Sequence, residues 1–160
     1  MAVEDEDATT DVVIVELGRV RFAFPAASVL EVLPLFEPTP MPDWPEHALG
    51  VLELRSRLMP LIDPSPLLGL VAAPLQVTQC ILEMEVDGHL LGVLVDRVEA
   101  VTRVALRDAA SLDAAVLKPS ALCLGLFSWH DAPILLLDPR PLLATLHASV
   151  QPAAAALPGT

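Results

Sequence analysis

The sequence predicts a mainly β protein whose two halves share one design, with helices that are few and short. The strongest observation is a repeated strand end: residues 61–68 (LIDPSPLL) and 136–143 (LLDPRPLL) are identical at six of eight positions. In both copies an apolar run leads into Asp-Pro, where Asp caps the free N–H groups of a helix and Pro suits its first position. Hairpin patterns precede both copies. The repeat therefore predicts two similar half-domains.

Composition and charge limit the classes of function. The chain has 160 residues, 54% of them hydrophobic and 19% charged, which is enough apolar material for one domain or two small subdomains that share a core. Its net charge of −12 argues against binding to nucleic acid or anionic lipid. No apolar run reaches the roughly 18 residues of a membrane span, and the acidic start, MAVEDED, is unlike a signal peptide. We expect a cytoplasmic protein without direct membrane insertion.

The first half begins with an acidic tail at residues 1–10, which is predicted to be disordered. Apolar alternation over 13–17 and 20–24 predicts a hairpin that turns at Gly18-Arg19. The apolar stretch 28–33 predicts a third strand, which Pro34 ends.

A second hairpin follows a loop that contains five prolines between residues 34 and 45. The runs 51–54 and 58–62, joined by Arg55-Ser56-Arg57, form this predicted hairpin. It leads into a short helix that stops at Gly69. Five short strands with little helix indicate a small closed barrel.

The second half repeats this order. Residues 80–86 and 90–95 predict a hairpin around Asp87-Gly88, which is a strong turn signal, and a Val-rich strand follows. The remaining predicted elements are a polar, Ala-rich connection at 107–120, strands at about 122–126 and 134–137, a helix at about 139–148 and a loose tail at 149–160.

No residues are arranged for catalysis or metal binding. Cys80 and Cys123 lie in apolar strands and are interpreted as small buried side chains that do not form a disulfide. The four histidines have no His or Cys partner at metal-ligand spacing, and the pair His130-Asp131 lacks a placed nucleophile. We therefore expect no enzyme activity, no metal and no cofactor.

Six short motifs occur in an order that resembles the CheW-like domain family, over roughly residues 10–148. They are Leu17-Gly18, Val29-Leu30-Glu31-Val32, GVLELR at 50–55, Pro60-Leu61-Ile62-Asp63, GVLVDRV at 92–98 and Leu137-Asp138. The resemblance implies a mainly β fold of two five-stranded β-barrel subdomains packed across a hydrophobic groove, with short helices. We expect the barrels to form approximately from residues 11–70 and 76–148, with an exchange of terminal strands between them left open.

The resemblance also implies a function. CheW-like proteins are non-catalytic adaptors that couple the cytoplasmic tip of a methyl-accepting chemoreceptor to the regulatory domain of a CheA-type histidine kinase. The chain is therefore expected to act as a scaffold in chemotaxis or a related two-component signal transduction pathway, recruited to receptor arrays.

The sequence departs from the family at the turn of its central hairpin. Where the family usually has Asn-Leu-Arg-Gly, this chain has Glu53-Leu54-Arg55-Ser56. Ser replaces a Gly that adopts positive φ without cost, and Glu adds a charge. The alternative interpretation is a diverged member that retains only one partner and acts as a pathway-specific linker or decoy. A small barrel that binds an apolar ligand is less favoured, because the side chains of five short strands fill such a barrel.

Ten residues are assigned to the surface that binds the partners. Arg55 and Glu31 are charges in otherwise apolar strands, and the family pattern brings the two positions together. We expect an ion pair at the groove that partner contacts reorganise; the alternative is a solvated pair worth under about 1 kcal/mol. For Asp96, turn formation or hydrogen bonding at a strand edge is the more ordinary role. The full set is Val29, Glu31, Gly50, Glu53, Arg55, Ser56, Leu94, Val95, Asp96 and Val98, with Val101 as a further apolar candidate.

Overall fold

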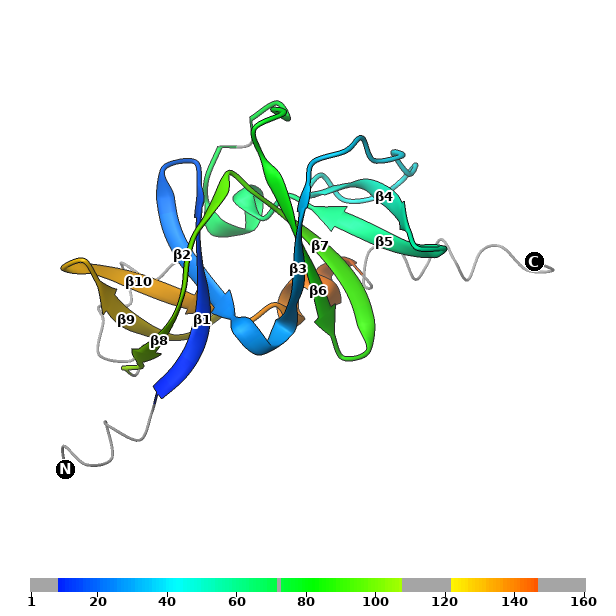
Figure 1. Ribbon diagram of the computed structural model, residues 1–160. Helices are drawn as coiled ribbons and strands as arrows, with labels where there is room; N and C mark the ends of the chain where they lie inside the picture. The colour runs from blue at the N-terminus through cyan, green and yellow to red at the C-terminus, as the bar shows by residue number, and fades with distance from the viewer. Residues whose placement is uncertain (1–8, 72, 108–121, 147–160) are drawn as a thin grey trace.

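The computed structural model describes residues 9–71, 73–107 and 122–146, and these residues are mainly in β-strands. The strands form two five-stranded sheets that lie side by side (Figure 1). In chain order they are β1 (Thr9–Leu17), β2 (Val20–Pro25), β3 (Val29–Pro34), β4 (Ala48–Leu54), β5 (Arg57–Ile62), β6 (Cys80–Val86), β7 (His89–Val95), β8 (Arg97–Ala105), β9 (Cys123–Trp129) and β10 (Ala132–Leu137).

The helical elements are short, as predicted. They are the 3-10 helices η1 (Ala26–Ser28) and η2 (Ser65–Leu68) and a helix at 140–146. Gly69 ends η2 in the left-handed conformation, with a φ of 75°, which confirms the predicted helix stop. The predicted tails at 1–10 and 149–160 lie outside the described residues, apart from two residues at the start of β1.

The two sheets have the same topology. One sheet has the strand order β8-β1-β2-β10-β9, and the other has the order β3-β6-β7-β5-β4. If β6 is taken as the equivalent of β1, β7 as that of β2, and so on to β10 and β5, the two sheets have the same strand order. A parallel pair occurs in each sheet, β2 with β10 and β5 with β7. The topology therefore supports the duplication that the repeated octapeptide predicts.

The first hairpin of each half lies in the sheet of the other half. The β1–β2 hairpin pairs with β8 and β10, and the β6–β7 hairpin pairs with β3 and β5. Residues 11–70 and 76–148 therefore do not build one barrel each, and the strands are exchanged between the halves. The turn fixes how the two strands of a hairpin pair with each other, but burial and long-range packing decide what pairs with their outer edges. Local sequence patterns therefore do not show which strands pair with the outer edges of a hairpin.

A short backbone bridge closes each curled sheet into a barrel. Thr39 and Val51 exchange two backbone hydrogen bonds of 2.9 Å, and Arg107 and Leu126 exchange two of 2.7 and 3.0 Å. In the first barrel the bridge ties the loop after β3 to β4, and in the second it ties the end of β8 to β9. The two bridges are thus equivalent features of the two halves.

A glycine lies beside each bridge, at equivalent places in the sequence repeat. A Cβ added to Gly50 would overlap the carbonyl oxygen of Thr39 and lie 2.7 Å from its carbonyl carbon, and Gly50 has a φ of +147°. A Cβ added to Gly125 would lie 3.0 Å from the carbonyl oxygen of Arg107. Close approach of two backbone segments therefore requires glycine at both places, and most strictly at Gly50.

Four hairpins turn through two residues that both have positive φ. The pairs are Gly18-Arg19, Arg55-Ser56, Asp87-Gly88 and His130-Asp131. Positive φ at both central residues defines the type I′ turn, whose twist matches that of paired strands. The predicted turns at Gly18 and Asp87-Gly88 are confirmed. The central hairpin has one connecting residue fewer than predicted, because Arg57 already belongs to β5.

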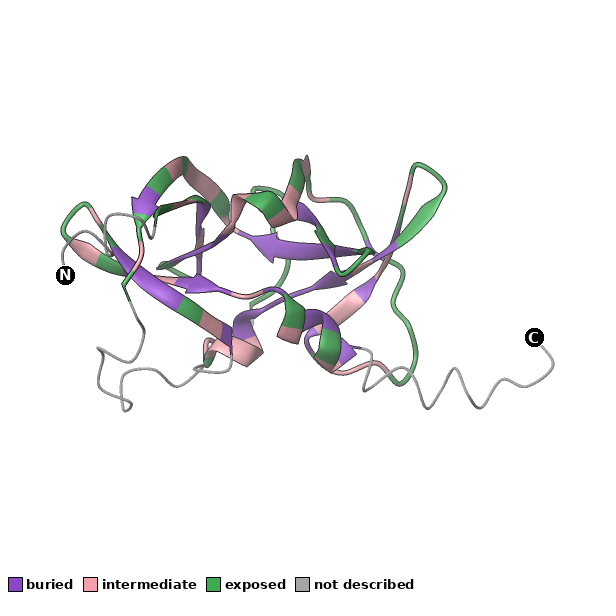
Figure 2. Cartoon of the chain, turned by 90° about the horizontal axis from the view of Figure 1, so that it is seen from below, coloured by how far each residue is buried: buried purple, intermediate pink, exposed green. Residues whose placement is uncertain are grey.

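Among the described residues, buried side chains form three cores, and several strands contribute both faces to them (Figure 2). Along β1, Val12 and Ile14 fill one barrel, while Val13 and Val15 face the core between the two sheets. This central core also contains Phe22, Phe24, Leu82, Met84, Leu91, Val93 and Val95. The core of the other barrel contains Leu52, Met59, Leu61, Ile81, Leu90 and Leu94. The central core therefore packs the two barrels together.

Candidate partner-binding face

Arg55 lies at the turn of the β4–β5 hairpin and bridges two carboxylates. Its Nη2 donates to both carboxylate oxygens of Glu83, at 2.8 and 3.0 Å. Its Nη1 donates to Oε2 of Glu31 at 3.3 Å. Glu31 on β3 and Glu83 on β6 are directly opposite each other in an antiparallel pair. The expected contact between Arg55 and Glu31 is therefore present, as part of a larger cluster.

The two ion pairs of Arg55 have different surroundings. The side chain of Glu83 is 1% exposed, whereas those of Arg55 and Glu31 are 62% and 52% exposed. The hydrogen bonds that Arg55 donates to Glu83, and then to Glu31, raise the pKa of Arg55, so its guanidinium stays charged. In the contact with Glu83 one nitrogen, Nη2, reaches both carboxylate oxygens; this contact is shorter and shielded from water on one side, so it holds Arg55 in place. The exposed contact with Glu31 is the weaker one.

Sequence reasoning missed Glu83. In the alternation of β6 it shares a face with Glu85, and such a face is normally solvated; Glu85 is indeed exposed. Glu83 is instead covered, with Gly92 as its cross-strand neighbour on β7 and Arg55 over its carboxylate. The arrangement brings β3 and the turn at Arg55 to β6, and both are distant from β6 in sequence, so no local signal reveals it.

Three other predicted site residues lie on the β4–β5 hairpin. Gly50 is buried beside Thr39, and its place is explained by barrel closure. Glu53 is exposed on β4, directly opposite Leu58 of β5. Ser56 is exposed and has a φ of 65°, which an L-residue adopts at a cost and glycine adopts freely. Of the three, Glu53 and Ser56 are therefore accessible to a partner.

The predicted apolar groove residues divide into buried and half-buried sets. Leu94 and Val95 are 1% and 0% exposed, so the prediction that they line an open groove is wrong. Both faces of this part of β7 are apolar because one face fills a barrel and the other the central core. Val29 and Val98 are half-buried and pack against the central core.

Asp96 braces the connection between β7 and β8. Its Oδ2 accepts from the backbone N–H of Gly18 at 2.9 Å, and its Oδ1 accepts from Nε2 of Gln79 at 3.0 Å. Its own N–H donates to the carbonyl of Glu16 at 2.8 Å. The side chain thus links two turns through hydrogen bonds. This is the structural role expected for Asp96 from the sequence.

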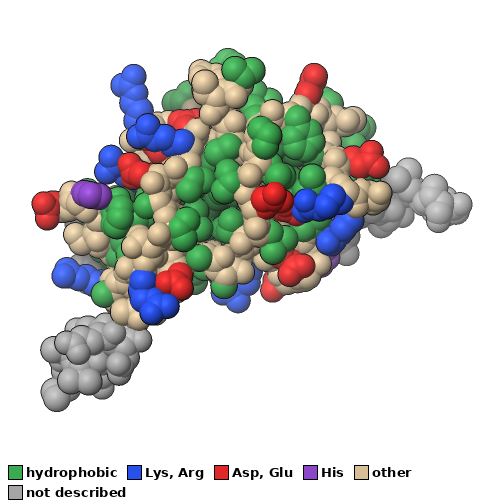
Figure 3. Space-filling view, viewed as in Figure 1, with side chains coloured by type: hydrophobic (Ala, Val, Ile, Leu, Met, Phe, Trp, Pro, Cys, Tyr) green, Lys and Arg blue, Asp and Glu red, His purple; other side chains and the backbone are tan. Residues whose placement is uncertain are grey.

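Exposed apolar side chains lie on the outer strands of both sheets. Leu30 and Val32 of β3 are 53% and 46% exposed, and Val101 of β8 is 67% exposed. Apolar side chains gather in the middle of the face that carries β1 and β3, with charged side chains toward its flanks (Figure 3). Val101 was an expected candidate, whereas Leu30 and Val32 were missed. Their alternation with Glu31 placed them in a strand, but it did not show that β3 is an edge strand.

The part of the chain that the structure describes contains no group of three or more His, Cys, Asp or Glu side chains placed to hold a metal ion. Burial raises the pKa of the thiols of Cys80 and Cys123, which lie in different sheets. None of the helices in residues 9–71, 73–107 and 122–146 combines the length and apolar character of a membrane span.

Comparisons with known proteins show what the chain is similar to. A family model described as the CheW-like domain matches residues 11–147. The chain is 33% identical over 98 residues to "Chemotaxis protein CheW" of Rhizobium meliloti (strain 1021), covering 61% of this chain and 63% of that protein. It is 30% identical over 94 residues to "Probable chemotaxis protein CheW" of Rhizobium etli, covering 59% and 61%. The match thus spans about three fifths of the length of these relatives.

A solved structure has a similar fold. The crystal structure of the scaffolding protein TtCheW from Thermoanaerobacter tengcongensis matches with a TM-score of 0.75 and 21% identity, over 83% of this chain and 91% of that one. At this identity the likeness concerns the fold alone. Because the family model spans most of the sequence and the ten described strands have the matching fold, the chain belongs to the CheW-like domain family.

Proposed function

We propose that this chain is a non-catalytic adaptor that couples chemoreceptors to a CheA-type histidine kinase in bacterial chemotaxis or a related pathway. The observation that carries the proposal is that β3 and β8 present exposed apolar side chains on a molecule that also presents the charged hairpin turn at Arg55. An apolar centre with a charged rim is the usual composition of a protein interface. The names of the two rhizobial relatives support the same pathway.

The adaptor works by holding its two partners in one arrangement. The central core packs the two barrels against each other, so a partner bound to one barrel is positioned relative to a partner bound to the other. The receptor tip contacts the exposed apolar side chains Leu30, Val32 and Val101, and the kinase domain contacts the β4–β5 hairpin. Binding to the receptor also recruits the chain from the cytoplasm to receptor arrays.

Arg55 is suited to exchange partners during binding. A carboxylate or carbonyl oxygen of the kinase domain competes with Glu31 for Nη1, because that bond is long and exposed. Glu83 keeps the guanidinium in place during the exchange through its two shorter bonds. A bound oxygen therefore meets a positioned donor rather than a mobile side chain.

The test is a calorimetric titration of the full chain with the regulatory domain of the CheA-type kinase of its own organism, and separately with the receptor tip. Binding to both, with Arg55→Ala and Glu31→Ala changing the kinase affinity and Val101→Ser changing the receptor affinity, is the expected result. Arg103→Ala is the matched control for the kinase titration, since it removes an exposed ion pair with Asp11 on the other sheet. No binding to either partner would refute the adaptor role.

A second candidate is a diverged adaptor that retains one partner and acts as a pathway-specific linker or decoy. Glu53 and Ser56 favour it, because both are exposed at the hairpin and differ from the family pattern in charge and in backbone freedom. Binding to the receptor alone, with kinase binding restored by Glu53→Asn and Ser56→Gly, would establish this candidate. Unchanged kinase binding in those variants would exclude it.

A further inference from the structure

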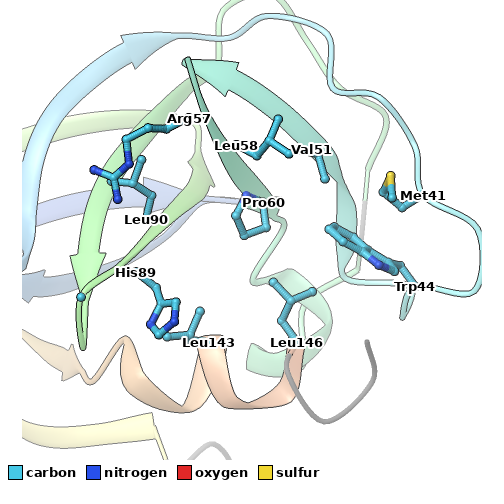
Figure 4. Close-up of a pocket in the computed structure, with 11 residues that line it drawn as sticks. Met41, Trp44, Val51, Arg57, Leu58, Pro60, His89, Leu90, Leu143 and Leu146 are labelled. Carbon is cyan, nitrogen blue, oxygen red and sulfur yellow. The ribbon is translucent and has the colours of Figure 1, made fainter. Parts of the chain in front are cut away.

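A pocket of about 430 Å³ lies on the outer side of the β4–β5 hairpin (Figure 4). Three segments enclose it: the hairpin itself, the loop that carries Met41 and Trp44, and the helix at 140–146, which contributes Leu143 and Leu146. The turn between β6 and β7 completes the wall. A volume of this size is in the range of sites that hold small organic molecules.

The pocket is apolar because the hairpin breaks the usual alternation of a barrel strand. Met59 and Leu61 point into the barrel core, so Leu58 and Pro60 face outward, together with Val51, which is opposite Pro60. Outward positions of a half-solvated strand are normally polar. Here Leu58 is 72% exposed and Met41 is 42% exposed. The helix covers part of this apolar face, and the pocket is the part left open.

One strong cation lies in this apolar wall. The guanidinium of Arg57 lies beside Leu90 at one side of the pocket (Figure 4). Five other arginines form ion pairs, namely Arg21, Arg55, Arg97, Arg103 and Arg140. Within the described residues Arg57, Arg19 and Arg107 form none, although the chain carries a net charge of −12, and of these three only Arg57 lines this pocket. An uncompensated guanidinium beside an apolar cavity is complementary to an anion that has an apolar body.

We infer that this pocket binds a small soluble carboxylate with an apolar body, such as a medium-chain or aryl-substituted acid. The carboxylate pairs with the planar fork of Arg57, which matches it with two parallel hydrogen bonds. The apolar body lies between Trp44 and the leucines of the helix and covers Leu58. The pocket shares the β4–β5 hairpin with the surface proposed for the kinase domain, but the inference is tested on the chain alone, so its outcome does not depend on either proposed partner.

Trp44 provides a direct readout of binding. The chain has two tryptophans, and the other, Trp129, is in β9 of the other sheet. In the Trp129→Phe variant of the full chain, Trp44 is the only indole. Titration with decanoate below its micelle concentration is expected to change the Trp44 fluorescence saturably, with one site and a Kd below about 1 mM. The neutral analogue decanol, compared at equal concentrations within its submillimolar solubility, should bind at least about tenfold more weakly.

Matched variants separate this site from general apolar adsorption. Arg57→Ala should weaken decanoate binding by roughly tenfold or more, and Arg57→Lys by less, because an ammonium lacks the fork. Arg103→Ala, which removes the same charge from an exposed site in the other sheet, should leave the affinity unchanged. Leu58→Glu places a carboxylate at a side chain that is 72% exposed, so the fold should tolerate it while binding is lost.

Several outcomes would overturn the inference. They are no saturable change up to a few millimolar decanoate, equal affinity for decanol, or an affinity that Arg57→Ala leaves unchanged. A chain cut after residue 146 tests a further occupant: if decanoate binds only after residues 147–160 are removed, that segment and not a small acid fills the pocket. If sedimentation shows that Leu58→Glu dissociates a dimer, a second copy fills it instead.

Discussion

The close approach at Gly50 predicts that Gly50→Ala destabilises the fold far more than the same change at Gly125. Two costs add at Gly50. A φ of +147° is nearly exclusive to glycine, and holding alanine there costs about 1–3 kcal/mol. The overlap of the new Cβ with the Thr39 carbonyl also forces apart the bridge of two 2.9 Å hydrogen bonds to Val51, worth about 0.5–1.5 kcal/mol each. The expected total is about 2–6 kcal/mol, against about 5–15 kcal/mol for a whole domain.

Gly125→Ala is the matched control. It brings a Cβ to 3.0 Å from the Arg107 carbonyl without a positive φ, so we expect a cost below about 2 kcal/mol. Equilibrium unfolding in urea, followed by circular dichroism, measures both changes, and an unchanged slope shows that the same transition is compared. A cost at Gly50 below about 1 kcal/mol, or equal costs at the two glycines, would refute the argument. A folded, stable Gly50→Ala protein that fails to bind the kinase would make Gly50 a contact residue instead.

Three further changes have expected outcomes. Arg55→Ala should lower the urea midpoint, because it leaves the carboxylate of Glu83 buried and unpaired. Adding Glu83→Gln should recover most of the lost stability. A double variant no more stable than Arg55→Ala would contradict this. Ser56→Gly should raise the free energy of unfolding by about 0.5–1 kcal/mol, since it relieves a φ of 65°, and a loss of stability in the same assay would count against it. For Asp138, burial acts to raise the pKa, but hydrogen bonds from Arg140 lower it below its usual value, so the stability from this pair is present above about pH 4 and is lost as pH falls through the lowered pKa. The difference in stability between the natural chain and Arg140→Ala should therefore shrink from pH 6 to pH 2, as acid-dependent unfolding would show; a constant difference would rule this out.

Local signals predicted the elements of this fold well. The turns at Gly18 and Asp87-Gly88, the helix stop at Gly69 and the duplication were all visible, because each depends on residues that are near one another in sequence or on a repeated pattern. The contact between Arg55 and Glu31 was available only through the family resemblance, which carries long-range information that composition and spacing lack.

The features that could not be predicted all depend on which strand edges meet. The exchange of hairpins requires β2 to pair with β10 rather than with β3, and nothing in the alternation of either strand favours one edge over the other. The burial of Glu83 and of Leu94 follows from the same choice. Glu83 is covered because β6 lies between β3 and β7, and Leu94 is enclosed because β7 faces two cores at once. Patterns of period two assign a side chain to a face, but they do not say what covers that face.

The exchanged hairpins have a consequence for how such a molecule is related to simpler ones. A chain of half this length would satisfy the same strand pairings by associating with a second copy of itself, each copy lending its first hairpin to the other. Joining the two copies in tandem replaces that association with an intramolecular one, at an effective concentration in the roughly millimolar range. In a tandem chain the sequences of the two halves can also differ from each other. The turn that carries Arg55 in one half carries His130 in the other, so the two halves present different side chains at equivalent turns. A tandem chain can therefore recognise two unlike partners, whereas a symmetric dimer would bind the same partner twice.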